Sequence, residues 1–379
     1  MSTSIQPFQL AIPEAELLDL RRRLERTRWP DPETVGDWSQ GVPLAQAKSL
    51  VEYWLSQYDW RRCEARLNAL GQFTTEIDGV AIHFLHVRSR HEGAMPMILS
   101  HGWPGSVIEF LKVIAPLTDP TAHGGRAEDA FHVVIPSLPG FGFSGKPTGT
   151  GWGVAKIADA WHALMQRLGY TRYVAQGGDW GSLVTTQLGR LQPPGLAAIH
   201  VNLPVVLPAE LGPEFSAGEA AMLGALQDYD RWDAGYSKQQ STRPQTLGYG
   251  LADSPAGQAM WIYEKFWKWM DCNGDPLSVV AADEILDNIM LYWLSNSAAS
   301  SARLYWESYE GAFVAVPLSL PVGCSIFAKE IYQAPRSWAE RCMSNLIHWN
   351  EVPKGGHFAA FEQPQLFVEE LRNCFRSLR

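Results

Sequence analysis

The segment Gly177-Gly178-Asp179-Trp180-Gly181 lies between a predicted strand, Tyr173 to Gln176, and a predicted helix. It has the form Gly-x-Nu-x-Gly of a nucleophile elbow, a tight strand-to-helix turn whose glycines permit a strained backbone. Such a turn projects its central side chain, here Asp179, at the edge of a sheet. A carboxylate is a nucleophile suited to an sp³ carbon that bears a leaving group, and its attack forms an ester on its own side chain. Water must then cleave that ester to release the product.

Predicted strands and helices alternate on both sides of this turn. Met95 to Ser100 and Phe131 to Ile135 are short apolar strands, and a helix is predicted after each. Such alternation is typical of a parallel sheet that is covered on both faces. Strand signals are absent from about residue 207 to 317 and resume at Val322 to Phe327. A helical cap inserted over the carboxyl edge of the strands explains this order, because such sheets bind ligands at that edge.

The chain is therefore predicted to have three parts. Residues 1–72 form an amino-terminal helical region, since apolar residues recur there at three- and four-residue spacing. Residues 73–206 and 318–379 form an α/β-hydrolase core with a mostly parallel sheet, and residues 207–317 form the helical cap.

A histidine and an acid are needed to activate the water. His357 lies in Lys354-Gly355-Gly356-His357-Phe358, just after the last predicted strand, and so takes the histidine's place in the order nucleophile, acid, histidine. Its role would be that of a general base. Glu330 follows a core strand and is well placed to orient the imidazole. Glu340 and Glu351 are competitors, since spacing alone does not exclude them.

The loop His101-Gly102-Trp103-Pro104 follows the first core strand. An α/β-hydrolase takes one oxyanion-hole N–H from this loop and the other from the residue after the nucleophile. These would be the backbone amides of Trp103 and Trp180. Each such donor is worth about 10²–10³ in rate.

An epoxide that opens on Asp179 needs a proton donor for its oxygen. Tyrosine hydroxyls in the cap would face the nucleophile, although most cap tyrosines pack in the protein interior. Six are available: Tyr236, Tyr249, Tyr263, Tyr292, Tyr305 and Tyr309.

Composition narrows the functional class further. The 31 Lys and Arg residues against 40 Asp and Glu residues give a net charge of −9, which argues against a nucleic-acid partner. The polar start and the absence of a run of 18 apolar residues favour a cytoplasmic protein without a membrane anchor. Five scattered cysteines suggest neither a disulfide framework nor a zinc site.

The 16 Trp residues are unusually many. We expect those of the cap to help line an apolar pocket, and those of the amino-terminal helices to serve packing. The cap tryptophans are Trp232, Trp261, Trp267, Trp269, Trp293 and Trp306.

Over nearly its whole length the sequence resembles the microsomal-type epoxide hydrolase family, including its juvenile-hormone-hydrolase and soluble microbial branches. The resemblance rests on four segments that together are highly specific. They are Leu20-Arg21-Arg22-Arg23-Leu24 with Thr27-Arg28-Trp29-Pro30-Asp31, His101-Gly102-Trp103-Pro104-Gly105-Ser106, the Asp179 turn, and Gly355-Gly356-His357-Phe358-Ala359-Ala360-Phe361-Glu362.

The resemblance implies a role for each matching residue. Asp179 matches the nucleophile, His357 the base, and Glu330 in Phe327-Ala328-Lys329-Glu330 the charge-relay acid. Tyr305 and Tyr236 match the two ring-opening tyrosines, Tyr236 in more variable surroundings. The implied reaction converts an apolar epoxide and water to a vicinal diol and needs no cofactor or metal. The membrane-anchoring helix of microsomal members is missing, and assembly into a homo-oligomer stays open.

Two other functions remain as alternatives. Haloalkane dehalogenation uses the same Asp and His chemistry and often has a Trp after the nucleophile to hold halide, a place that Trp180 would fill. The cap tyrosines and the resemblance along the whole chain favour the epoxide, since a leaving alkoxide needs a proton and a leaving halide does not. The other alternative is a receptor of this fold that binds a small apolar ligand without turnover.

Overall fold

The computed structural model describes residues 4–208, 210, 212–311 and 313–379. Its centre is a nine-stranded sheet with the strand order β1-β2-β3-β5-β4-β6-β7-β8-β9. The strands β1 to β3 are antiparallel to their neighbours, and the pairs from β5 to β9 are parallel. The strands are β1 Gln6–Pro7, β2 Gln72–Ile77, β3 Val80–Val87, β4 Met95–Ser100, β5 Phe131–Pro136, β6 Tyr173–Gly177, β7 Leu196–Val201, β8 Val322–Lys329 and β9 Leu346–Gly356.

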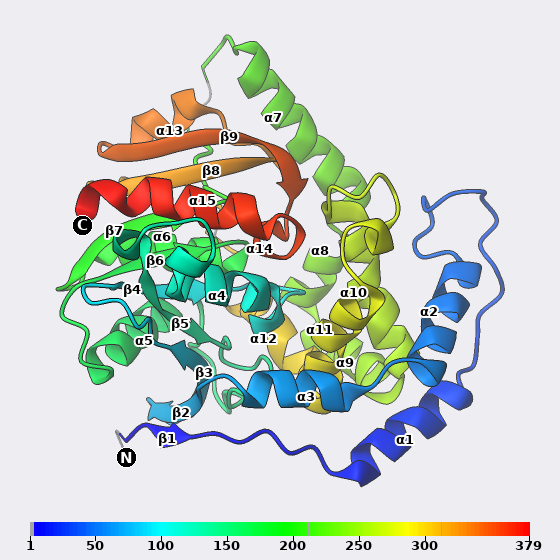
Figure 1. Cartoon of the computed structure of the whole chain (residues 1–379). Coiled ribbons are helices and arrows are strands. Elements are labelled where there is room, and N and C mark those ends of the chain that lie inside the picture. Colours follow the sequence, from blue (N-terminus) through cyan, green and yellow to red (C-terminus); the bar gives the residue numbers. More distant parts are fainter. Residues whose placement is uncertain (1–3, 209, 211, 312) are drawn as a thin grey trace.

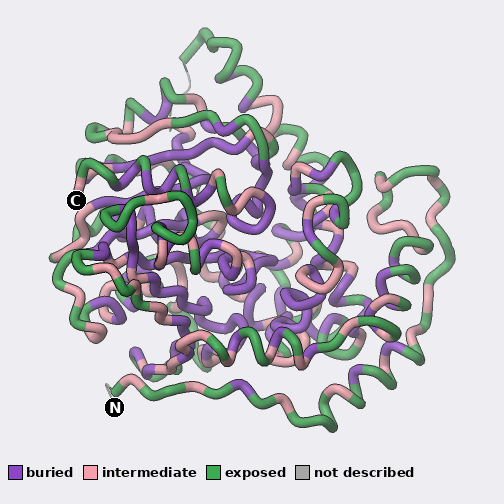
Figure 2. Tube along the Cα trace, viewed as in Figure 1, coloured by how far each residue is buried: buried purple, intermediate pink, exposed green. Residues whose placement is uncertain are grey.

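The central strands are apolar because helices cover both faces of the sheet. The strands β4, β5 and β6 are buried almost throughout, as Figure 2 shows for the middle of the molecule. The helices α4 (Leu111–Thr118) and α15 (Pro364–Phe375) pack together in front of the strands in Figure 1. The helices α5 (Val154–Arg167) and α6 (Trp180–Leu191) pack together on the other face. The predicted α/β-hydrolase fold is thereby confirmed.

The register of β4 and β6 determines where the functional loops meet. Ser100 is paired with Gly177, and these are the last residues of the two strands. The loop that begins at His101 and the turn that contains Asp179 therefore leave the sheet side by side at its carboxyl edge.

The chain between β7 and β8 is helical. Its described residues form a π-helical turn at Tyr229–Asp233 and six α-helices, which are drawn in green to yellow to orange beside the sheet in Figure 1. These helices are α7 Ala217–Asp228, α8 Gly235–Thr242, α9 Pro244–Asp253, α10 Pro255–Trp269, α11 Ala282–Leu294 and α12 Ala298–Ser308. We refer to residues 207–317 as the cap.

The amino-terminal helices pack on the cap. Helices α1 (Glu14–Glu25) and α2 (Leu44–Ser56) contact α10, and α3 (Trp60–Asn68) contacts α11. Two tyrosines on this side donate hydrogen bonds to carboxylates of α11: Tyr53 to Asp283 and Tyr58 to Asp287, both at 2.8 Å.

The start of the chain differs from the helical prediction for residues 1–72. Gln6 and Pro7 form β1, an edge strand paired with Phe73 and Thr74. Two residues are too few to produce an alternating pattern, so sequence periodicity could not reveal this strand. No helix in the described part of the chain is long and apolar enough to cross a membrane.

Candidate active site

Asp179 occupies a strained turn between β6 and α6. Its φ of +50° and ψ of −130° lie outside the regions that side-chain-bearing residues ordinarily adopt, as expected at a functional turn. The flanking glycines are required by close packing. A Cβ at Gly177 would lie 2.0 Å from the carbonyl oxygen of Gly181, and one at Gly181 would lie 2.0 Å from that of Ser100. The turn can therefore press against β4 only because these residues lack side chains.

The loop after β4 contacts the Asp179 carboxylate directly. The backbone N–H of Trp103 donates a 2.8 Å hydrogen bond to Oδ1 of Asp179. A Cβ at Gly102 would lie 2.1 Å from the same oxygen, so glycine permits this approach. The Trp103–Pro104 peptide bond is cis. Trp180 is the first residue of α6, where a backbone N–H has no acceptor within the helix.

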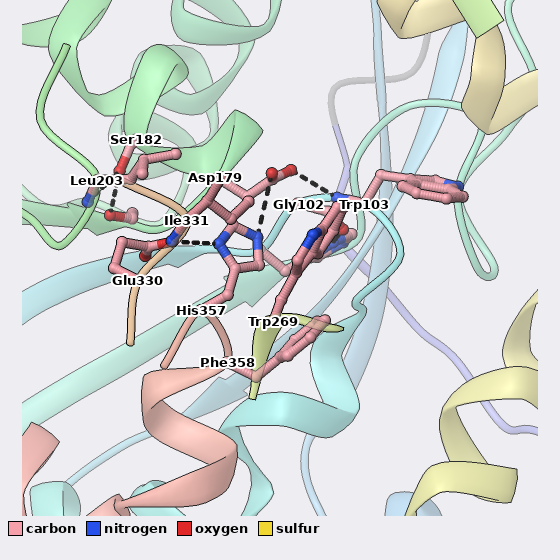
Figure 3. A network of polar contacts seen from close by, with 12 residues as sticks. Gly102, Trp103, Asp179, Ser182, Leu203, Trp269, Glu330, Ile331, His357 and Phe358 are labelled. Carbon is pink, nitrogen blue, oxygen red and sulfur yellow. Dashed lines mark hydrogen bonds and ion pairs between the residues drawn. The ribbon is translucent and has the colours of Figure 1, made fainter. Parts of the chain in front are cut away.

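His357 lies between two carboxylates (Figure 3). Its Nε2 is 3.2 Å from Oδ2 of Asp179, and its Nδ1 is 2.6 Å from Oε1 of Glu330. The backbone N–H of His357 donates to the carbonyl oxygen of Trp269, which fixes the loop against the cap. The side chains of His357 and Glu330 are almost fully buried.

The structure chooses among the three candidate acids. Glu330 alone of the three contacts His357, and its Oε1 also accepts the N–H of Ile331 at 2.7 Å. Glu340 pairs with Arg336 in an exposed contact, and Glu351 is exposed on β9. Chain order allowed all three, whereas the bend after β8 brings only Glu330 to the imidazole.

The two carboxylates govern the charge of His357. Burial alone would lower the pKa of the imidazole, but Glu330 and Asp179 outweigh it and hold this pKa well above the usual range. The imidazole therefore stays protonated while both neighbours are ionised.

Tyr236 of α8 and Tyr305 of α12 face Asp179 from the cap. The Tyr236 ring stacks on Trp103 with 4.9 Å between centroids, and the Tyr305 ring meets Trp180 edge to face at 4.7 Å. The two phenol rings are 5.8 Å apart. Burial, together with the Asp179 carboxylate, raises the pKa of both phenols well above the usual range, so both keep their protons.

The other four cap tyrosines have different surroundings. Tyr249 is 70% exposed, and Tyr263 packs beside Trp38 of the amino-terminal region. The Tyr292 hydroxyl donates to the carbonyl oxygen of Gly105, and Tyr309 lines the cavity described next.

A cavity of about 230 Å³ opens between Asp179 and the cap. Apart from Asp179, Asp230 and the tyrosine hydroxyls, its walls are apolar, with aliphatic side chains from both the core and the cap. They include Leu183, Leu203, Val205, Met222, Leu226 and Ile331. A ligand that reaches Asp179 thus meets a largely apolar wall.

The expectation that cap tryptophans line this cavity is wrong. Trp232 and Trp306 are 73% and 49% exposed, and none of the six belongs to the described lining. Trp269 is buried, but it packs behind Trp103, Tyr236 and His357. Tyrosines and aliphatic residues take the expected role, because the cap helices turn their tryptophans elsewhere.

A second, much smaller cavity touches Asp179 and His357. Its volume is about 20 Å³, enough for one water molecule, and Glu109 is among its lining residues. Burial raises the pKa of the Glu109 carboxyl to about 8. Sequence reasoning did not single out Glu109. The only signal was the spacing Ser106-x-x-Glu109, typical of a capping box, which the structure contains.

The buried Glu109 predicts a pH-dependent stability. Its pKa in the folded protein exceeds the value of about 4.3 in an unfolded chain, so folding favours the protonated form. Its contribution to the free energy of unfolding should therefore fall as pH rises from about 4 to 8, by at most about 1.4 kcal/mol per pH unit. We expect Glu109→Gln to remove the part of the pH-dependent loss of stability that comes from Glu109. Denaturant titrations at pH 5 and pH 8 measure the free energy of unfolding of both proteins.

A matched control is Glu340→Gln, because Glu340 is exposed. This variant should show the pH dependence of the unmodified protein. The interpretation of Glu109 fails if Glu109→Gln also retains the full loss of stability between pH 5 and pH 8.

Comparisons with known proteins identify the family of the chain. Residues 5–110 match the family described as "Epoxide hydrolase N terminus", and residues 95–244 match the "alpha/beta hydrolase fold" family. An epoxide hydrolase homologue of Stigmatella aurantiaca is 61% identical over 99% of this chain and 86% of its own length. Epoxide hydrolase 1 of Sus scrofa is 35% identical over 97% of this chain and 88% of its own length.

Solved structures give the same result. The Aspergillus niger epoxide hydrolase superposes with a TM-score of 0.88 at 33% identity, covering 99% of this chain and 97% of that chain. The juvenile hormone epoxide hydrolase of Bombyx mori superposes with a TM-score of 0.90 at 30% identity, covering 100% of this chain and 96% of that chain. With these relatives matching along nearly the whole length, the chain belongs to the microsomal-type epoxide hydrolase family, which joins an epoxide hydrolase amino-terminal region to an α/β-hydrolase fold.

Proposed function

We propose that this enzyme converts an apolar epoxide and water to a vicinal diol through a covalent ester on Asp179. The observation that carries the proposal is the placement of two buried phenols opposite a carboxylate that contacts both a backbone N–H and an imidazole. A nucleophile and proton donors thus face each other across one apolar cavity.

Ring opening is the first step. Oδ2 of Asp179 attacks an epoxide carbon, the carbon–oxygen bond of the ring breaks, and the oxygen takes a proton from Tyr236 or Tyr305. The Asp179 side chain becomes a neutral ester. His357 then loses one of the two carboxylates that held its pKa high, so it can return a proton to the tyrosine and become neutral.

Ester hydrolysis is the second step. Neutral His357, oriented by Glu330, takes a proton from a water that attacks Cγ of Asp179. The amide of Trp103 already contacts Oδ1, where negative charge develops, and the amide of Trp180 is the proposed second donor. Cleavage of the Cγ–Oδ2 bond releases the diol, whose oxygen takes the proton of the hydroxyl added to Cγ, and this restores the Asp179 carboxylate beside a protonated His357. The small cavity beside Glu109 is the proposed source of the water.

Proton demand distinguishes this function from haloalkane dehalogenation. A halide leaves without a proton, whereas an epoxide oxygen needs one, and two protonated phenols face the nucleophile. Trp180, which could hold a halide through its indole N–H, packs edge to face with Tyr305.

The test is a panel of terminal, cyclic and trans-disubstituted epoxides with chiral analysis of the diols, run beside haloalkanes with halide detection. We expect diol formation and no halide release. Halide release without diol would favour the dehalogenase, and binding of epoxides without turnover would favour a receptor.

The two phenols predict a selective effect on ring opening. Tyr236→Phe or Tyr305→Phe should slow ester formation, and the double variant should slow it by at least about 100-fold because no proton donor remains. Stopped-flow measurement of ester formation separates this step from hydrolysis. Tyr249→Phe, which changes an exposed cap tyrosine, is the control and should leave the rate unchanged. Full ring-opening activity in the double variant would exclude both hydroxyls as donors.

A further inference from the structure

The cap buries an ion pair behind Tyr236. Nζ of Lys265, on α10, is 2.8 Å from Oδ1 of Asp233, the last residue of the π-helical turn. The two side chains are only 3% and 6% exposed. Glu264, which is partly exposed, is the second partner of the ammonium group at 2.9 Å. Lysine and aspartate are rarely buried to this extent in folded proteins.

This pair contacts the proposed active site. The ammonium group lies over the Tyr236 ring, 4.5 Å from its centroid, and 5.3 Å from the Trp269 ring. Trp103 stacks on Tyr236 at 4.9 Å, so an indole and a cation both contact this phenol ring. The other oxygen of Asp233 accepts the indole N–H of Trp269 at 2.6 Å. The ammonium is therefore directed at Tyr236, while its counter-ion is anchored on Trp269.

Stability alone is a poor reason for this arrangement. Removing two charges from water costs several kcal/mol per ion, and apolar residues of similar volume are often as stable or more so. A second feature points to function: the irregular turn that carries Asp233 also carries Tyr229, whose hydroxyl is 2.9 Å from that of Tyr236. Helical turns of the π type occur frequently at functional sites. Both ends of this turn thus position groups around one phenol.

The chemistry of ring opening explains what a cation would do there. When Tyr236 gives its proton to the epoxide oxygen, negative charge develops on the phenolate and spreads into its ring. A cation over the ring attracts this charge more strongly than it attracts the neutral phenol, and the attraction is largest where water is excluded. The interaction is therefore stronger in the transition state than in the resting enzyme, which is the requirement for catalysis.

We propose that Lys265, held in place by Asp233, is a positioning residue that stabilises the charge on Tyr236 during epoxide ring opening. This inference rests on the proposed function of Asp179 and Tyr236. It assigns to the cap an electrostatic role in the first chemical step, and none in ester hydrolysis.

The main test replaces both charges with neutral groups of similar shape, as Lys265→Met with Asp233→Asn. Asparagine can still accept the N–H of Trp269. Rapid mixing with one epoxide gives the rates of ester formation and ester hydrolysis separately. We expect ester formation to slow about tenfold, as for a desolvated cation–π contact, with hydrolysis changed by less than about twofold. Equal slowing of both steps would overturn the inference.

A double-mutant cycle separates this electrostatic effect from packing. In a Tyr236→Phe background residue 236 has no hydroxyl and gives no proton. Adding Lys265→Met and Asp233→Asn to that background should therefore cause no further slowing of ester formation. If the tenfold effect persists in that background, Lys265 does not act through Tyr236. Tyr58→Phe is the control for loosening of the cap, because it removes a hydrogen bond to α11, and both rates should stay unchanged.

Asp233→Asn alone keeps the test decisive if the neutral pair does not fold. It retains the ammonium, and both the asparagine oxygen and Glu264 can still hold that group over Tyr236, so ester formation should slow by no more than about twofold. A tenfold loss in this variant would contradict the inference. If the unmodified protein forms no ester on Asp179, then the proposed function itself has failed, and this outcome is distinguishable from all of the above.

Discussion

Asp179→Ala is expected to abolish epoxide hydrolysis, with a loss of at least about 10⁴-fold. Loss of a covalent nucleophile leaves only binding and the remaining site groups, which account for a small part of the rate. His357 would still face Glu330, but no atom could form the ester. Diol formation, with intact-protein mass spectrometry to detect the adduct, measures both consequences.

Asp78→Ala is a matched control for this experiment. Asp78 also has a positive φ, +48° against +50° for Asp179, but it lies in the turn between β2 and β3 and pairs with Lys156. Both replacements change a strained aspartate, and only one removes a carboxylate from the cavity. Full activity is expected for Asp78→Ala. Diol formation by Asp179→Ala at a rate near that of the unmodified protein would refute the ester mechanism.

The parts of the site that were predicted are those encoded by local sequence. The turn around Asp179 needs glycines at fixed spacing, and the loops of Trp103 and His357 directly follow core strands. The alternation of apolar strands and helices determines the sheet, and the sheet brings these loops together through the Ser100–Gly177 pairing. Short-range patterns are therefore sufficient to predict that Asp179 and His357 meet at one site.

The parts that were missed depend on burial, which only the folded chain determines. Lys265 lies in a helix whose sequence, Trp-Ile-Tyr-Glu-Lys-Phe-Trp, gives no sign that its charge is enclosed. Glu109 is the third residue of a short helical turn, Val107–Phe110, a place where many surface glutamates also occur. For Glu330 chain order alone left two other acids open, the family resemblance selected it, and the structure shows its contact with His357.

His357→Gln is expected to trap the reaction at the ester. Asp179 and both tyrosines remain, so an epoxide should still alkylate the enzyme. Hydrolysis should slow by about 10²–10⁴-fold, because glutamine takes no proton from water. After one turnover, mass spectrometry should find the enzyme heavier by one substrate molecule, and peptide mapping should place the adduct on Asp179.

His348→Gln is the matched control, since His348 also bonds to a buried glutamate, Glu370, at 2.8 Å but lies away from the cavity. It should turn over substrate without accumulating an adduct.

Oxygen labelling then shows whether water attacks the ester or the epoxide. In one turnover of the unmodified enzyme in H₂¹⁸O, water that attacks Cγ leaves ¹⁸O in the Asp179 carboxylate, whereas direct attack on the epoxide leaves it in the diol. Label found in the diol alone, together with no adduct in His357→Gln, would mean that His357 activates water against the epoxide itself and that Asp179 forms no bond to carbon.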